Sequence, residues 1–228
     1  MSEIYNIILP VYVINLKERE ERLIHILKEF DDVKKFNITI IQSSKNDKAN
    51  VDLWNNVKKC IKAGIEEDHD FIIVCEDDHA FTDAYSYQYL LKCIQEARNK
   101  DAEILCGGVS WFKTGVQISE NLFWVESFTG LQFTIIFKNI FHKILTSEFS
   151  IDDFADLKIT ELCSNKFIIH PFISTQKEFG YSDVTARNDG TDRVELLFTK
   201  ASQTLELLKK VRNFYLDNSI VDNNLLQL

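Results

Sequence analysis

Apolar residues recur along this chain in short runs and in helical stripes, and the two kinds of segment alternate. Residues 7–16 and 36–42 are apolar runs with β-branched members, which is typical of strands. A segment with helical spacing follows each run, the first over residues 23–30 and the second from about Asn50, a suitable helix cap. A third apolar run begins at Phe71. This order predicts a parallel sheet with crossover helices.

The remainder of the chain continues the alternation with further strands and helices. Strands are expected over residues 102–106, 123–128, 131–137 and 167–173. Helices are expected over residues 85–99, through Ile140 and Ile144, and from residues 150–154 onward. Residues 176–190 are polar and predict a loop, and residues 192–217 predict an amphipathic helix.

These elements predict an α/β fold class: a mixed, mainly parallel sheet flanked by helices. We expect a single domain over residues 1–190, with a C-terminal helix and tail over residues 191–228 packed on it.

Composition and charge restrict the partners and the cellular compartment that we expect for this protein. The net charge of -9 argues against a nucleic-acid-binding protein. Five scattered cysteines without paired spacing predict buried thiols in a reducing compartment. The apolar run 7–16 is too short to span a bilayer and lacks the features of a signal peptide. We therefore expect a cytoplasmic protein, with peripheral membrane association and homo-oligomerisation left open.

The third apolar run ends in an acidic cluster, Glu76, Asp77 and Asp78. Adjacent carboxylates at the end of a buried strand repel one another unless a cation or a basic partner neutralises them. Their oxygen atoms suit Mn²⁺ or Mg²⁺, and such ions usually bridge to phosphate groups of a ligand. The alternative is a solvated acidic loop.

Polar side chains follow the first two strands at the same predicted edge of the sheet. Asn15 and Ser43 end or follow these strands, while Arg19 and Arg22 lie near the start of the first helix. They are candidates for binding a nucleotide, and a solvated charged face is the alternative for the two arginines. Trp111 and Phe112 are candidates for lining a sugar pocket, with core packing as the alternative.

Taken in order, several motifs resemble those of glycosyltransferase family 25, the lipopolysaccharide and collagen-galactosyltransferase type, which has the GT-A fold. The resemblance covers about residues 7 to 180. Four pieces match: residues 11–16 followed by Arg19 and Arg22, the acidic cluster after a hydrophobic strand, the glycine-led strand 130–136 with its following helix, and residues 151–154 at the position of the late acidic motif.

The resemblance implies roles for individual residues. Asp78 would be the direct metal ligand with Glu76 assisting, and His170 is a candidate second ligand, with a structural histidine as the alternative. Asp152 would be the catalytic base, with Asp153 in reserve and helix capping as the alternative for both. The nucleotide would be bound by Asn15, Arg19, Arg22, Ser43 and Asp77.

The function that the resemblance implies is metal-dependent, inverting transfer of a sugar from a nucleotide-diphosphate donor. The acceptor would be a hydroxyl of a cell-surface glycan or of its lipid-linked precursor. One alternative is a non-catalytic domain of the same fold that binds a nucleotide or glycan within a larger assembly. A second is a receiver-like signalling domain with acids around Mg²⁺, although the β-rich second half argues against it.

Overall fold

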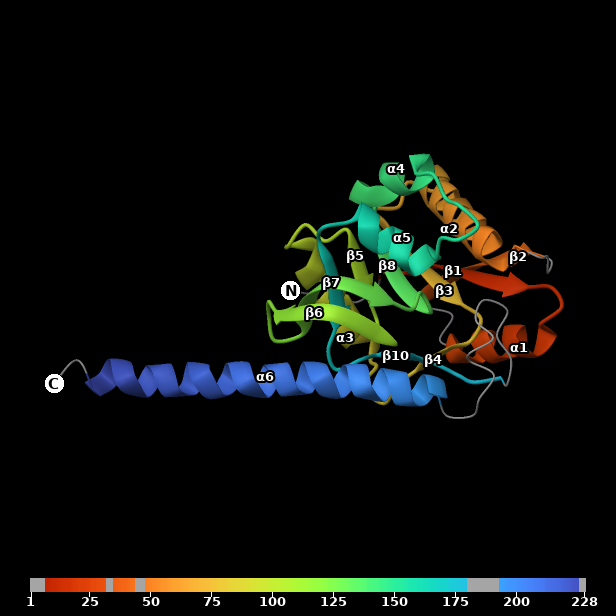
Figure 1. Cartoon of the computed structure of the whole chain (residues 1–228). Helices are drawn as coiled ribbons and strands as arrows, with labels where there is room; N and C mark the ends of the chain where they lie inside the picture. The colour runs from red at the N-terminus through yellow and green to blue at the C-terminus, as the bar shows by residue number, and fades with distance from the viewer. Residues whose placement is uncertain (1–6, 32–34, 44–47, 180–192, 226–228) are drawn as a thin grey trace.

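The computed structural model describes residues 7–31, 35–43, 48–179 and 193–225, with the side chains of the last helix described as far as Leu216. Figure 1 shows a central sheet with helices on both faces and a long C-terminal helix that runs past the body. The helices are α1 (Glu20–Glu29), α2 (Ala49–Glu66), α3 (Tyr87–Arg98), α4 (Lys138–Thr146), α5 (Ala155–Leu162) and α6 (Arg193–Leu225).

The central sheet has eight strands in the order β2-β1-β3-β8-β5-β9-β7-β6. Strands β2, β1 and β3 are parallel neighbours, as are β5 and β9, whereas β8 and β7 run antiparallel to the strands beside them. The predicted α/β class with a mixed, mainly parallel sheet is therefore confirmed. The strands are β1 (Leu9–Leu16), β2 (Phe36–Ser43), β3 (Phe71–Glu76), β5 (Ile104–Cys106), β6 (Trp111–Gln117), β7 (Leu122–Thr129), β8 (Phe133–Phe137) and β9 (Lys166–Ile169).

Strand β3 is buried on both faces, as its continuous apolar run predicts. Ile72 and Val74 belong to one hydrophobic cluster, and Ile73 and Cys75 belong to the other. Successive side chains of a strand point to opposite faces, so β3 anchors both layers of helices. Its rigid end therefore fixes the position of the acidic cluster that follows.

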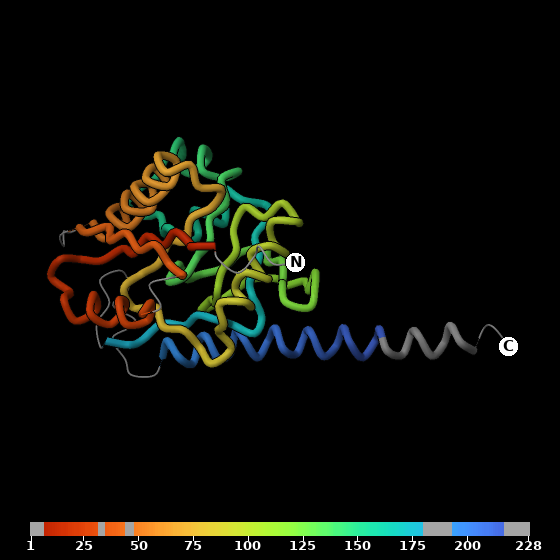
Figure 2. The backbone as a smooth tube through the Cα atoms, turned by 180° about the vertical axis from the view of Figure 1, so that it is seen from behind, coloured from red at the N-terminus to blue at the C-terminus, as the bar shows by residue number. Residues whose placement is uncertain are grey.

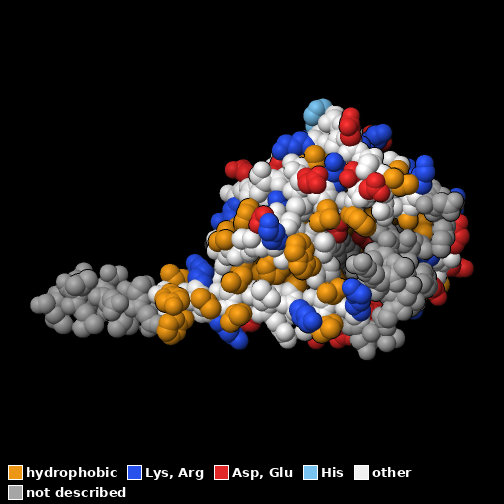
Figure 3. All heavy atoms as spheres, in the orientation of Figure 1, with side chains coloured by type: hydrophobic (Ala, Val, Ile, Leu, Met, Phe, Trp, Pro, Cys, Tyr) orange, Lys and Arg blue, Asp and Glu red, His pale blue; other side chains and the backbone are white. Residues whose placement is uncertain are grey.

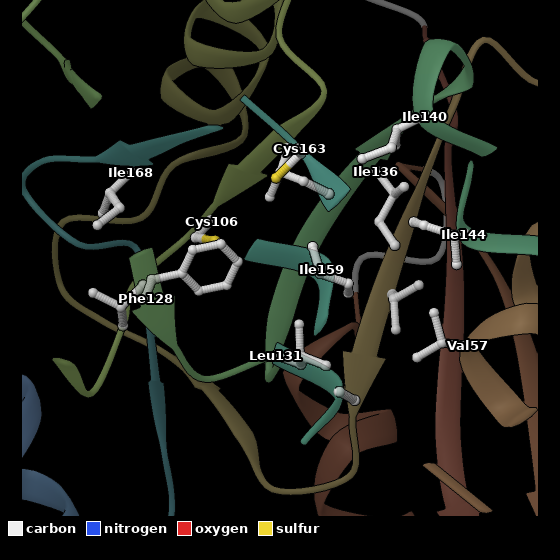
Figure 4. Close-up of a cluster of buried hydrophobic side chains, with 14 of the residues drawn as sticks. Val57, Cys106, Phe128, Leu131, Ile136, Ile140, Ile144, Ile159, Cys163 and Ile168 are labelled. Atoms are coloured by element: carbon white, nitrogen blue, oxygen red, sulfur yellow. The ribbon is translucent and has the colours of Figure 1, made fainter. Parts of the chain in front are cut away.

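The first hydrophobic cluster packs the sheet against helices α2, α4 and α5 and includes the first half of α6. Figure 4 shows side chains of this cluster, among them Val57 of α2, Ile144 of α4 and Ile159 of α5, gathered over the strands. The second cluster contains Ile26 of α1 and Leu90 of α3. Burial of one such aliphatic side chain contributes about 1.5–3 kcal/mol, so both layers hold their helices firmly.

The structure corrects several predicted boundaries. Helix α2 begins at Ala49, so Asn50 lies inside the helix and is not its cap. The helix expected from residues 150–154 begins only at Ala155. Residues 111–117, which had no predicted element, form the edge strand β6. The start of the expected loop at residue 176 belongs to β10 (Ser174–Gln176), which pairs with β4 (His79–Phe81) directly after the acidic cluster.

The first half of α6 packs on the body and its second half leaves it, as the tube in Figure 2 shows. Val194, Phe198, Ala201 and Leu205 are buried in the first hydrophobic cluster. Side chains from Lys210 to Leu216 are exposed. Among the described ranges, no helix combines the length and apolar composition that crossing a bilayer requires. The five cysteines are free and buried.

Candidate active site at the carboxyl ends of β1 and β3

The site forms where the parallel strands β1 and β3 end side by side. Ile14 of β1 is the register partner of Glu76 of β3, so Asn15, near the end of β1, lies beside Asp77, the first residue after β3. Nδ2 of Asn15 donates a hydrogen bond of 2.9 Å to Oδ2 of Asp77. Both residues are buried, so this bond fixes the turn after β3 against the end of β1.

Arginines at the start of α1 neutralise part of the charge of the acidic cluster. Nη1 of Arg22 lies 3.2 Å from Oδ1 of Asp77 and 3.0 Å from Oδ2 of Asp78. Nη1 of Arg19 lies 3.8 Å from Oδ1 of Asp77. The sequence placed these residues in one region, and the structure brings them together. In this structure, however, Arg22 faces the carboxylates themselves, a contact that the sequence analysis did not predict.

Burial governs the protonation of the cluster. It raises the pKa of Asp78 to about 6, although the Arg22 guanidinium partly offsets this effect. Burial raises the pKa of Glu76 well above its ordinary value, and the neighbouring charges of Asp78, Asp77 and Asp156 raise it further. The two arginines therefore do not fully compensate the negative charge of the site. A bound cation would lower the pKa values of Glu76 and Asp78.

A late segment of the chain closes the site from the other side. Nε2 of Gln176 donates a hydrogen bond of 3.4 Å to Oδ1 of Asp78, and the backbone N–H of Lys177 donates one of 2.8 Å to the carbonyl of Asp78. The Phe179 ring covers Arg22, with 4.8 Å between the guanidinium carbon and the ring centroid. Of residues 176–190, which were predicted as a loop, residues 180–190 lie outside the described residues.

Asp156 is a carboxylate of this region that the sequence analysis missed. Its Oδ2 accepts a hydrogen bond of 3.0 Å from the backbone N–H of Gly130, and its charge raises the pKa of Glu76. Burial raises the pKa of Asp156 itself. Gly130 has a φ of 113° between β7 and β8, a conformation that favours glycine. The sequence offers one signal for Asp156, an acidic residue that follows the glycine-led strand 130–136. Three acids within residues 152–156 match this signal, so the sequence does not single out Asp156.

Asp152 and Asp153 occupy a turn before α5. Asp152 is exposed. Oδ2 of Asp153 accepts a hydrogen bond of 2.7 Å from the backbone N–H of Ser150 and lies 3.9 Å from Nζ of Lys158. The N-cap of α5 is Phe154, without a side-chain cap bond, so the helix-capping alternative is wrong for both aspartates. Asp153 instead stabilises the turn before the helix, and the catalytic role of both residues stays a prediction.

His170 lies on the α6 side of the sheet. Its Nε2 is 3.2 Å from Oε2 of Glu206, and its ring packs edge-on against Phe123 at 5.6 Å. Burial lowers its pKa. These contacts tie the end of β9 to α6, so a role as the second metal ligand stays a prediction.

Ser43 lies at the carboxyl end of β2, beside the end of β1, and its Oγ accepts a hydrogen bond of 3.0 Å from Asn56. It lines a pocket of about 540 Å³. The other lining residues are Asp52, Asn55, Asn56, Lys58, Lys59 and Lys62. Of the sugar-pocket candidates, Phe112 packs against the core, whereas Trp111 is exposed.

The donor atoms of the acidic cluster suit a hard divalent ion, because they are carboxylate oxygens in a buried, electron-rich position. Within the described part of the chain, no three His, Cys, Asp or Glu side chains form a ready-made metal site. Figure 3 shows acidic side chains in a hollow of this face, beside residues that are not described. A metal here would need ligand oxygens as well as those of the protein.

Comparison with known proteins identifies the fold. No protein-family model and no curated protein sequence matches the chain. Protein A197 from STIV has a TM-score of 0.55 at 13% identity, covering 75% of this chain and 86% of that one. A glycosyltransferase involved in glycosylation of the major capsid of PBCV-1 has a TM-score of 0.46 at 10% identity, covering 84% and 98%. Apo UDP-glucose pyrophosphorylase has a TM-score of 0.43 at 8% identity, covering 88% and 82%. The likeness to A197 shows a shared fold, and any function has to be inferred from the side chains.

Proposed function

We propose that the chain is a metal-dependent, inverting glycosyltransferase that moves a sugar from a nucleotide-diphosphate donor to a hydroxyl of a cell-surface glycan or its lipid-linked precursor. The observation that carries this proposal is the largely buried acidic cluster at the carboxyl end of β3, faced by Asn15, Arg19 and Arg22. Ligands of open α/β sheets bind at this edge. The resemblance to glycosyltransferase family 25 supplies the substrate class.

Asp78 and Glu76 would hold Mn²⁺ or Mg²⁺ in this proposal. A bound ion would stabilise the charge that develops on the diphosphate leaving group. Both carboxylates have pKa values raised by burial, so binding a cation offsets an existing cost. His170 is a weaker candidate because Glu206 already engages its ring nitrogen.

The donor nucleotide would lie over the ends of β1 and β2. Asn15, Ser43 and Asp77 would recognise polar groups of the nucleoside, and the arginines would bind its phosphates. Arg19 lies farther from the carboxylates than Arg22, so it is better placed to turn toward a phosphate. Arg22 would keep the two aspartates in position.

Three acids are candidates for the base that takes the acceptor proton. Asp152 and Asp153 are the candidates from the sequence. Asp156 is our preferred candidate, because the Gly130 N–H holds its carboxylate, its charge acts on Glu76, and burial raises its pKa. The exposed Trp111, whose register partner Thr129 precedes Gly130, would offer an aromatic face to an acceptor sugar.

One observation favours the non-catalytic alternative. Arg22 bridges Asp77 and Asp78, so the cluster is neutralised in part without a metal. A domain of this kind would bind a nucleotide or glycan without turnover.

A panel of nucleotide sugars with and without Mn²⁺ tests the proposal. A ligand that binds the native state raises the melting temperature by mass action, so an active donor should give a metal-dependent increase. Released nucleoside diphosphate then distinguishes an enzyme from a binding domain. A panel that causes no shift at millimolar concentration, with or without metal, would contradict both functions.

A further inference from the structure

The second half of α6 projects into solvent, beyond the β-strands that support its first half. Leu205 is the last fully buried side chain, and Leu208 is the last that packs against the core. Figures 1 and 2 show the helix continuing well past the body. A helix gains most of its stability from packing, so an exposed apolar face on this part requires an explanation.

An apolar stripe follows this projecting part. Leu207, Val211 and Phe214 are 60%, 46% and 62% exposed, and their spacing of four and three residues places them on one face. Tyr215, 67% exposed, lies beside this face. In Figure 3 hydrophobic side chains gather on the projecting helix, just before the atoms that are not described. Contiguous exposure of this kind marks an interaction surface, unlike single scattered apolar residues.

Cationic side chains border the stripe. At 100° per residue, Lys210 falls on one side of the stripe and Arg212 on the other, with Lys209 on the opposite face. The acidic residue nearest to them, Glu206, faces His170 and lies 3.7 Å from Lys210. Residues 207–216 therefore present an aromatic and aliphatic face with three cations and no acidic residue of their own, and Glu206 pairs with Lys210 at one edge.

We infer that residues 207–216 of α6 bind an anionic lipid surface, with the stripe inserted at the boundary between headgroups and acyl chains. Apolar and aromatic side chains on one face and basic residues on the other are typical of helices that lie in a membrane interface. Long cationic side chains at the borders can reach the headgroups while their stems stay in the apolar layer.

Charge favours a lipid surface over a second copy of the chain. Pairing this segment with itself would bring the bordering cations of both copies together. From Leu207 to Phe214 the stripe is also only roughly 10 Å long, which is short for an independent helix pair. Because residues 207–216 carry a charge of +3, the net charge of -9 leaves -12 on the rest of the protein. Its repulsion is screened within about 8 Å at physiological ionic strength, so a projecting helix escapes most of it.

Sedimentation with vesicles of an equal mixture of phosphatidylcholine and phosphatidylglycerol tests the inference, since these lipids carry no sugar acceptor and report the surface alone. The intact protein should sediment with them and remain in solution with pure phosphatidylcholine. The double variant Leu207→Ser/Phe214→Ser should bind at least tenfold more weakly, as should Lys209→Gln/Lys210→Gln/Arg212→Gln. High salt should release the wild type.

Ile65→Ser is the matched control, because Ile65 is a similarly exposed apolar residue at the end of α2. It should bind vesicles like the wild type. Light scattering tests the competing outcome, that the stripe forms a dimer. The inference would be overturned if the wild type were a dimer that does not bind vesicles and the Leu207→Ser/Phe214→Ser variant were a monomer. Equal binding to neutral and anionic vesicles would also overturn it.

Discussion

Nη1 of Arg22 lies 3.0 Å from Oδ2 of Asp78, and this contact joins the first turn of α1 to the acidic cluster after β3. The two residues are separated by 56 positions in the chain. The Arg22 and Asp78 side chains are only 5% and 16% exposed, so each compensates the charge of the other in a mostly dry environment.

Arg22→Ala should destabilise the protein by about 3–5 kcal/mol at neutral pH, because it leaves buried carboxylates without their partner. Urea unfolding measures the loss. Arg98→Ala is the matched control: Arg98 pairs with Asp70 at the surface, where both side chains are substantially exposed, so its loss should be about 1 kcal/mol or less. Equal effects of the two substitutions would contradict a structural role for Arg22.

Arg19→Ala should weaken binding of a nucleoside diphosphate by about tenfold, since a charge-assisted phosphate contact contributes roughly 1.5–3 kcal/mol. Calorimetry measures the affinity, and the melting temperature of the free protein should change little. Unaltered affinity would mean that Arg19 interacts with the acidic cluster and does not contact the nucleotide.

Asp78→Asn should keep the fold and abolish the metal-dependent part of nucleotide-diphosphate binding. The amide preserves shape and one acceptor but removes the charge that holds Mn²⁺ or Mg²⁺. Titration calorimetry with and without Mn²⁺ gives the result, and Asp83→Asn, an exposed acid, is the control. Retained metal dependence in a folded Asp78→Asn variant would exclude Asp78 as the ligand.

The metal-free protein should become less stable as the pH rises from about 4 to about 6. Native Asp78 has a pKa of about 6, whereas the ordinary value is 3.8, so in this window the native state binds more protons than the unfolded state. The contribution of this group is at most about 3 kcal/mol. Unfolding measured across this range should show a shallower slope for Asp78→Asn, and a slope that survives the substitution would assign the effect to other groups such as Glu76.

Single asparagine variants at Asp152, Asp153 and Asp156 should identify the base. We expect Asp156→Asn to lower turnover by about a hundredfold or more while donor affinity stays near wild type, the pattern of a lost general base. Asp152→Asn should have little effect, because its side chain is exposed. If Asp152→Asn lowered turnover more than Asp156→Asn, the base would be Asp152, the candidate from the sequence.

His170→Gln should leave metal-dependent nucleotide binding unchanged and make α6 more sensitive to limited proteolysis, because His170 faces Glu206 of α6. Glu206→Gln is the paired variant and should have the same effect on proteolysis. A fall in Mn²⁺ affinity specific to His170→Gln would instead support the predicted ligand role.

The sequence alone determined the layered core and the location of the acidic cluster. Continuous apolar runs predicted β1 and β3, and helical spacing predicted α1, α2 and the packed half of α6, because burial on one or two faces leaves a periodic trace in the residues themselves. It missed β6, since an edge strand is half exposed and needs no such period.

Only the tertiary structure decided which polar groups meet. Strands β4 and β10 have three residues each, too few for a local signal, and exist because they pair with each other directly after the acidic cluster. The contacts of Arg22 with Asp77 and Asp78, and of Asp156 with Gly130, join segments far apart in the chain. Such contacts depend on where a strand ends and how a helix crosses it, so residue spacing along one segment cannot specify them.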